Sequence, residues 1–270
     1  MEELIRQAAV AGSFYPADGN ELNLMLKQFL AQAEQQQPRL AYAPKAIIAP
    51  HAGYIYSGPV AASAYYSLYV ASDSINRVVL LGPSHRVPFR GLASCSASHY
   101  ATPLGLIPLD RPALENIERL PQVSVNDAAH IPEHSLEVQL PFLQYILDDF
   151  VLTPLVVGDA NENEVAEVLE MLWGDRHTLI VISSDLSHYH DYATAQRLDQ
   201  QTSRAIETLN PAEIQYEDAC GRNPVNGLLH VAKRRAMHVE TVDLRNSGDT
   251  AGPRDQVVGY GAYLFFEHQA

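Results

Sequence analysis

The sequence predicts an α/β fold in which a central, largely parallel or mixed sheet is flanked by helices. Short β-branched and apolar runs alternate with longer helical patterns along the chain, the order that βαβ units produce. Three of the strand-like runs are apolar on both faces, as in strands covered by helices on each side. The 270 residues are 47% hydrophobic and 19% charged, and no repeat or linker divides them. We therefore expect one domain over residues 1–270.

The predicted strands are short apolar runs. In chain order they lie at 45–49, 77–81, 151–157, 178–182 and 257–266. The first, second and fourth are the runs that are apolar on both faces, whereas Pro154 interrupts the third.

Helical patterns fill the intervals between these strands. The first stretch, 20–36, repeats its apolar residues at helical spacing, and the next, 59–70, tolerates Pro59 in its first turn. The remaining helices are expected at 135–147, 162–173, 192–209 and 224–235.

Charge and hydropathy exclude several classes of protein. Lys and Arg number 18 against 32 Asp and Glu, so the net charge is -14. The longest basic run is Lys233-Arg234-Arg235, too little to track phosphates, so we expect no nucleic-acid partner. The apolar runs fall far short of the roughly 20 residues that span a bilayer, so no membrane association is expected. With no secretory signal and two cysteines, Cys95 and Cys220, that suit free thiols, we expect a cytoplasmic protein.

Histidines follow three of the predicted strands. His51 follows the first strand and His85 the second, while the fourth leads into Asp185 and His188. In an open α/β sheet, ligands bind outside the carboxyl ends of the strands. Each histidine taken alone is explained by a hydrogen bond that caps a strand end, but their joint arrival at one edge favours a binding site.

These side chains supply donors for a transition metal. Imidazole nitrogens and carboxylate oxygens bind Fe(II), Zn(II) or Mn(II). Two histidines and one carboxylate form the usual non-haem Fe(II) arrangement, which leaves positions for substrate and oxygen.

The segment 127–137 holds a second group of ionisable residues. His134 and Glu137 share a face of the predicted helix at i, i+3 spacing. They are candidates for a general acid/base pair, or for partners that orient a ligand histidine. Capping of the helix N-terminus by acidic residues is the alternative, and the two roles are compatible.

Several familiar motifs are missing from the sequence. It has no Gly-x-Gly-x-x-Gly, no P-loop, no Gly-x-Ser-x-Gly elbow and no His-Glu-x-x-His, so nucleotide binding and serine hydrolysis lose their usual support. Cys220 has no basic neighbour close in sequence except Arg222, and we do not expect it to be a nucleophile.

Six motifs occur in order along nearly the whole chain. They are Gly12-Ser13-Phe14-Tyr15-Pro16, Pro50-His51-Ala52-Gly53-Tyr54 with Ser57-Gly58, Gly82-Pro83-Ser84-His85, Glu133-His134-Ser135-Leu136-Glu137 with Leu140-Pro141-Phe142, Ser183-Ser184-Asp185-Leu186-Ser187-His188-Tyr189, and Asn246-Ser247-Gly248-Asp249. Together they resemble the Memo family, whose prokaryotic members are called AmmeMemoRadiSam system protein B.

The resemblance implies a fold similar to class III extradiol dioxygenases, the non-haem Fe(II) enzymes that open catechol rings. It implies that His51 and His85 hold the metal, and that Asp185 and His188 lie in the cleft as ligand or acid/base. Fe(II) is the metal expected first, with Zn or Cu as alternatives. The prokaryotic name also implies a radical-SAM partner protein and a small companion protein.

One departure from the family pattern concerns the third metal ligand. Animal members place a cysteine just before an Arg-Asn step, whereas Leu244 precedes Arg245-Asn246 here and cannot bind a metal. We therefore expect His188 to be the third ligand, with Asp185 as the second choice.

Three functions are compatible with these residues. The first is a metal-dependent redox enzyme that acts on an unknown small molecule with Fe(II) at His51, His85 and His188, while His134 and Glu137 orient groups or shuttle protons. The second is a non-catalytic metal- or partner-binding protein that keeps a relic of the dioxygenase site and works with the radical-SAM protein. The third is a hydrolase that uses Zn-activated water.

Overall fold

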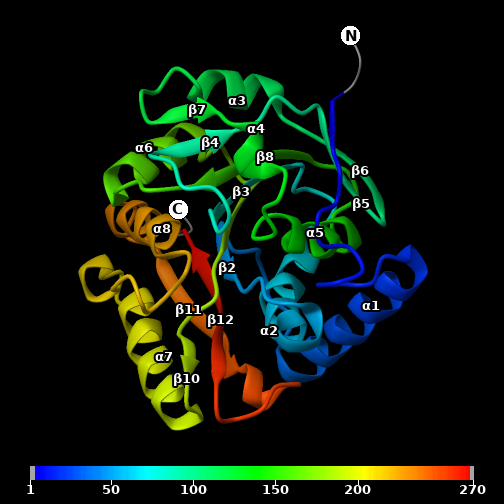
Figure 1. Cartoon of the computed structure of the whole chain (residues 1–270), viewed down its shortest axis with the longest axis vertical. Helices are drawn as coiled ribbons and strands as arrows, with labels where there is room; N and C mark the ends of the chain where they lie inside the picture. Colours follow the sequence, from blue (N-terminus) through cyan, green and yellow to red (C-terminus); the bar gives the residue numbers. More distant parts are fainter. Residues whose placement is uncertain (1–3, 268–270) are drawn as a thin grey trace.

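A mixed sheet of nine strands lies at the centre of the computed structural model, which describes residues 4–267 (Figure 1). Its middle consists of four mutually parallel strands in the spatial order β2 (Ala46–Ala49), β9 (Thr178–Ser183), β3 (Arg77–Pro83) and β8 (Val151–Val157). Next to β2 lies the antiparallel strand β12 (Val257–Phe266). All five predicted strands are present, and the predicted fold class is confirmed.

The remaining strands are not predicted from the sequence. Four of them extend the central sheet: β10 (His188–His190), β11 (His238–Asn246), β4 (Leu92–Ser94) and β7 (Val123–Val125). Three form a separate small sheet: β1 (Ile5–Arg6), β5 (His99–Thr102) and β6 (Gly105–Pro108). Most of these strands are short or partly exposed, so their sequences lack the run of apolar residues that marks a central strand.

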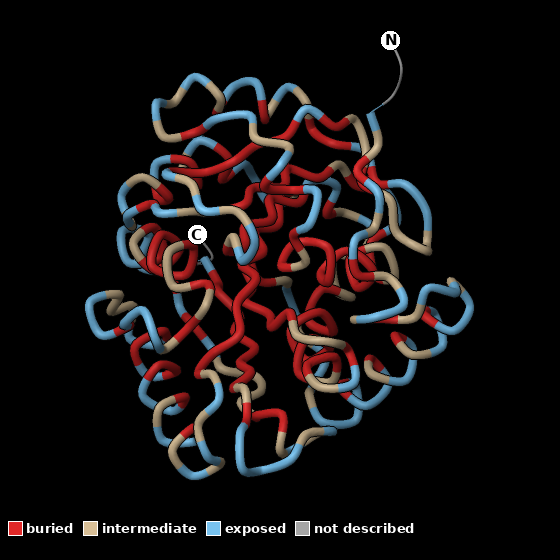
Figure 2. Tube along the Cα trace, viewed as in Figure 1, coloured by how far each residue is buried: buried red, intermediate tan, exposed pale blue. Residues whose placement is uncertain are grey.

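Helices cover the sheet on both sides (Figure 1). They are α1 (Gly19–Gln36), α2 (Tyr54–Tyr66), α3 (Arg111–Ile117), α4 (Asp127–His130), α5 (Leu140–Ile146), α6 (Glu162–Leu172), α7 (Tyr192–Glu207) and α8 (Arg222–Arg234), with 3-10 helices η1 (Ser67–Ala71), η2 (Glu137–Gln139), η3 (Pro211–Glu213) and η4 (Ser247–Asp249). α1, α2 and α5 pack together on one side, and α6 packs against α8 on the other. As Figure 2 shows, burial is concentrated in the central strands and the inner helix faces. Within residues 4–267, no helix combines the length and the apolar character that crossing a membrane requires.

Two predicted helices have different bounds in the structure. α2 begins at Tyr54, one turn before the predicted start, so Pro59 lies inside the helix. The predicted helix 135–147 is the short η2 followed by α5. The reason is local, because the carboxylate of Glu133 accepts hydrogen bonds from the backbone N–H groups of His134 and Ser135 and holds this stretch as a turn.

A buried ion pair ties the N-terminal segment to the first residue of η2. The guanidinium of Arg6 contacts the carboxylate of Glu137, and their side chains are 3% and 0% exposed. Glu137 also accepts hydrogen bonds from the N–H groups of Ala9 and Val10 at 2.7 and 2.9 Å and from the hydroxyl of Tyr15 at 2.5 Å. These four partners use the four acceptor directions that a carboxylate offers.

The substitution Glu137→Gln tests the contribution of this ion pair. It removes the charge that compensates a buried guanidinium, so we expect the free energy of unfolding to fall by about 3–5 kcal/mol. Urea unfolding followed by circular dichroism measures this change. The matched control is Glu170→Gln, because Glu170 pairs with Arg235 at the surface, where the two side chains are 26% and 34% exposed. The control should cost under about 1 kcal/mol, and equal losses in the two variants would contradict the prediction.

Candidate metal centre

The loops after three parallel strands meet at one edge of the sheet. β2 leads into His51, β3 into His85 and β9 into Asp185. Because these strands are parallel neighbours, their carboxyl ends share that edge. His51 and His85 lie side by side as the pattern predicts, with ring centroids 5.1 Å apart.

A third histidine, His134, completes a cluster with these two. One nitrogen from each of His51, His85 and His134 lies within 4.8 Å of the other two, and we call these residues the histidine trio. The rings of His85 and His134 stack at 4.6 Å, and His51 is edge-on to both. His188, which the sequence favours as the third ligand, is not part of this group. The reason is that it belongs to β10, which pairs with β12 and therefore lies two strands away from β2.

Hydrogen bonds fix which nitrogen of His51 carries a proton. The hydroxyl of Ser183 donates to the carbonyl of Ser135 at 2.6 Å and accepts from the amide of Gln139 at 2.8 Å. With its hydrogen used, this hydroxyl can only accept from Nδ1 of His51, 2.9 Å away. His51 is 1% exposed, and its Nε2 is left without a proton and can accept a hydrogen bond or bind a ligand.

Glu133 is the hydrogen-bond partner of Nδ1 of His85, as Ser183 is of Nδ1 of His51. Its carboxylate accepts hydrogen bonds from Nδ1 of His85 at 2.8 Å and from the backbone N–H of His85 at 2.6 Å. Burial raises the pKa of Glu133, but hydrogen bonds from His85 and Ser135 outweigh it and lower the pKa to about 2. The ionised carboxylate holds the proton on Nδ1, so Nε2 of His85 is also free. A carboxylate that orients a histidine in this way is typical of metal sites.

His134 brings a nitrogen without a partner. Its Nδ1 is buried and makes no hydrogen bond within the described part of the chain, although Oε1 of Glu133 lies 3.4 Å from it. Burial, and then the neighbouring His85, lowers the pKa of His134 to about 4. Burial, and then the other histidines, also holds the pKa of His51 well below its ordinary value. Both rings are therefore neutral at pH 7, which is the protonation state that binds a metal.

Asp185 and His188 lie beside the trio. The N–H of His51 donates to Oδ1 of Asp185 at 2.7 Å, and burial raises the pKa of this carboxyl to about 7. His188 lies near enough for its charge to lower the pKa of His51, and burial lowers its own pKa. The raised pKa suits Asp185 to exchange a proton near neutral pH.

Glu137 has a different position from the one that the helical pattern suggests. Its oxygens are occupied by the N-terminal segment, and it is Glu133, four residues earlier, that contacts the histidines. The motif containing Glu133 is visible in the sequence, but its place in a turn is not.

Sequence reasoning also missed Cys220. Its Sγ lies 3.3 Å from Nε2 of His51, although 169 residues separate the two. No local pattern signals this contact, because Cys220 lies in a loop just before α8.

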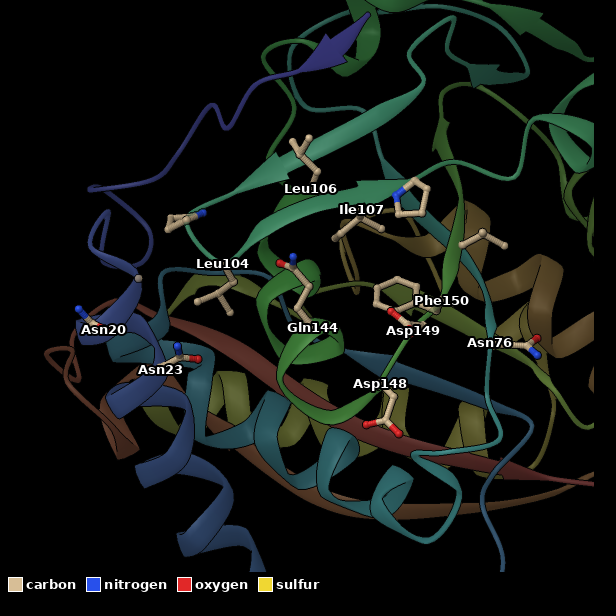
Figure 3. Close-up of a pocket in the computed structure, with 14 residues that line it drawn as sticks. Asn20, Asn23, Asn76, Leu104, Leu106, Ile107, Gln144, Asp148, Asp149 and Phe150 are labelled. Carbon is tan, nitrogen blue, oxygen red and sulfur yellow. The ribbon is translucent and has the colours of Figure 1, made fainter. Parts of the chain in front are cut away.

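The positions of two cavities can be compared with the position of the trio. One of about 820 Å³ lies between α1, the β5–β6 hairpin and the end of α5, where it is lined by amides and carboxylates such as Asn20, Gln144 and Asp148 (Figure 3). None of the trio lines it. A smaller cavity of about 300 Å³ is lined by Ser84, which precedes His85, and by Cys220. None of the trio lines the smaller cavity either, but Ser84 is the chain neighbour of His85 and Cys220 contacts His51.

Comparisons with known proteins agree with the motifs. A family model described as "Memo-like protein" matches residues 6–264. A "MEMO1 family protein" of Aquifex aeolicus is 38% identical, covering 97% of this chain and 99% of the relative. Similar relatives from Saccharolobus solfataricus and Methanosarcina barkeri are 34% and 35% identical, each covering 96% of this chain and 99% of the relative.

A solved structure shares the fold. The crystal structure of the uncharacterized protein JW3007 from Escherichia coli K12 superposes with a TM-score of 0.53 at 14% identity. The match covers 81% of this chain and 98% of that chain. At this level of identity the likeness concerns the fold alone.

The protonation of the trio can be tested in the metal-free protein. We expect ¹⁵N NMR at pH 6 to show neutral rings for His51 and His134, with the proton of His51 on Nδ1. Because the pKa of His134 is lowered to about 4, this ring should stay neutral as the pH falls to 5 and gain a proton only below that. A Ser183→Ala variant should lose the tautomer preference of His51. Titration of His134 near pH 6.5 would contradict the prediction.

Proposed function

The chain belongs to the Memo-like protein family, and from this membership and the geometry of the trio we propose that it binds a divalent transition metal, Fe(II) first, and uses it in a redox reaction on a small molecule. The observation that carries the proposal is the arrangement of the trio. One ring nitrogen from each of His51, His85 and His134 lies within 4.8 Å of the other two. Hydrogen bonds occupy Nδ1 of His51 and Nδ1 of His85, so Nε2 is the nitrogen that each of these two rings would offer to a metal.

The donor chemistry fits such an ion. Neutral imidazoles suit Fe, Zn and Cu, whereas Mg²⁺ and Ca²⁺ require oxygen ligands, and the trio supplies none. His51, His85 and His134 would hold the metal, and Glu133 would orient His85. The bound ion would supply a Lewis acid or one-electron redox centre. Iron is our first choice because the family resemblance points to non-haem iron enzymes, and Zn and Cu are the alternatives.

The remaining side chains would handle protons. Asp185, with a pKa of about 7, is suited to hold a proton at neutral pH and release it to a neighbouring group. His188 is a second acid/base candidate. A small molecule would reach this side of the sheet through the small cavity lined by Ser84 and Cys220. Glu137, bound to Arg6, serves the fold in this scheme.

Metal content tests the proposal and identifies the third ligand. We expect near-stoichiometric iron after anaerobic purification of the wild type, and loss of iron in His51→Ala and His85→Ala. His134→Ala should lose iron, and His188→Ala should keep it. The control is His238→Ala, because the side chain of His238 is 64% exposed, pairs with Glu240 and does not belong to the trio.

The results of these measurements distinguish the third ligand and separate the redox enzyme from a binding protein and from a hydrolase. Iron kept in His134→Ala but lost in His188→Ala would make His188 the third ligand. No metal in the wild type after reconstitution with Fe, Zn or Cu would favour a binding protein that works with the radical-SAM partner. Iron-loaded protein that consumes no O₂ with a broad panel of catechols and other ene-diols would argue against the redox reaction, and Zn-dependent turnover of an ester would favour a hydrolase.

Glu133→Gln tests the role of the orienting carboxylate. An amide in place of the carboxylate loses the negative charge and turns an N–H group toward the hydrogen-bond donors of His85. We expect metal affinity to fall by about 10–100-fold, as measured by competition with a chromogenic chelator. Circular dichroism must show that the variant is folded. Unchanged affinity in a folded variant would remove Glu133 from the metal centre.

A further inference from the structure

The carboxylate of Asp199 is buried behind the loop that carries Asp185 and leads into His188. Asp199 lies in the middle of α7 and is 3% exposed. Its Oδ1 accepts a hydrogen bond from the backbone N–H of Ser187 at 3.0 Å. Because Ser187 directly precedes His188, a carboxylate on α7 fixes the backbone beside an acid/base candidate of the site.

Burial of this carboxylate has a cost in stability. It raises the pKa of Asp199 to about 6, and the hydrogen bond from Ser187 offsets this effect only in part. A carboxyl whose pKa is raised by folding destabilises the folded state at pH 7, because its ionised form has lost water. A group that is kept despite such a cost is a candidate for a role in function.

The strand β12 leaves room for the carboxylate. A Cβ at Gly259 would lie 2.1 Å from Oδ2 of Asp199, so a side chain at this position would displace the carboxylate. The backbone of Gly259 also binds the loop: its N–H donates to the carbonyl of Ser187, and its carbonyl accepts from the N–H of Leu186, both at 2.8 Å. Asp199 and Gly259 therefore hold residues 186 and 187 together.

The strand pairing of β10 does not fix His188 in the same way. β10 pairs with β12 at His188 and His190, and the register shifts between these two residues. Tyr189, which lies between them, has a φ of 61°, in the left-handed region that a bulky residue rarely adopts. The position of His188 therefore depends on how the residue before it, Ser187, is held.

We propose that Asp199 is a positioning residue, which anchors the N–H of Ser187 and so keeps His188 beside the histidine trio. This inference rests on the proposed function, in which His188 is an acid/base candidate. The trio itself comes from other segments, since His51 follows β2, His85 follows β3 and His134 precedes η2. Loss of the anchor should therefore move His188 and leave the three histidines in place.

NMR of the metal-free protein tests the anchor, and its result stands whether or not the protein binds a metal. In the wild type we expect the N–H of Ser187 to be protected from hydrogen exchange. We also expect His188 to titrate below pH 6.5, because burial lowers its pKa and the neighbouring His85 and His190 lower it further. Asp199→Ala removes the acceptor, so the N–H of Ser187 should exchange at least about tenfold faster. The pKa of His188 should then rise toward 6.5 as the ring becomes more exposed.

Two further variants separate positioning from a general loss of structure. Asp199→Asn keeps a carbonyl oxygen for the N–H of Ser187, so it should restore the exchange rate and the pKa of His188 to their wild-type values. Ala205→Gly is the matched control, because it weakens α7 at another buried position and removes no side-chain hydrogen bond. It should leave both readouts unchanged.

Three results would overturn the proposal. The first is an unprotected N–H of Ser187 in the wild type, which decides the question even if Asp199→Ala fails to fold. The second is an unchanged pKa of His188 in folded Asp199→Ala. The third is a pKa in Asp199→Asn that differs from the wild-type value, because the anchor would then not be the hydrogen bond.

Discussion

The buried guanidinium of Arg6 is the constraint on which the candidate site depends. A charge removed from water costs several kcal/mol unless it is fully paired. Arg6 meets this requirement with the carboxylate of Glu137 and with the carbonyls of His130 and Glu133, which it reaches at 3.1 and 2.6 Å. These partners lie before and after one irregular turn, so satisfying Arg6 fixes the path of that turn. Glu133 and His134 lie on it, and the trio therefore takes its shape from a residue of the N-terminal strand.

Different partners hold the rings of His51 and His85, the two histidines that follow strands. A neutral network of Ser183 and Gln139 sets the tautomer of His51, whereas the ionised Glu133 sets that of His85. In both rings Nδ1 holds the proton and Nε2 is free. An anionic partner strengthens the donor character of an imidazole more than a neutral hydroxyl does.

The sequence predicted the central strands, the fold class and the meeting of His51 with His85, because these follow from apolar runs and from the geometry of parallel strands. The position of His134 beside His51 and His85 could not be predicted in the same way. The pattern at 135–147 suggested a helix, but the hydrogen bonds of Glu133 hold its beginning as a turn. The contact of Cys220 with His51 joins residues 169 positions apart and depends on the close approach at Gly221. Neither the turn held by Glu133 nor the contact of Cys220 with His51 produces a periodic or regularly spaced sequence pattern. Analysis of neighbouring residues therefore cannot detect them.

The strand order affects how this protein folds while it is being synthesised on the ribosome. β2, which leads into His51, takes its two neighbours from β9 and β12, and β12 ends at Phe266. Arg6 likewise gains its carboxylate partner only after Glu137 has been synthesised. β2 and Arg6 are therefore synthesised long before these partners exist, and closing such distant contacts is slow. A nascent chain of this kind exposes unpaired strand edges for most of its synthesis. Such edges favour aggregation, and chaperones that shield apolar segments counter it.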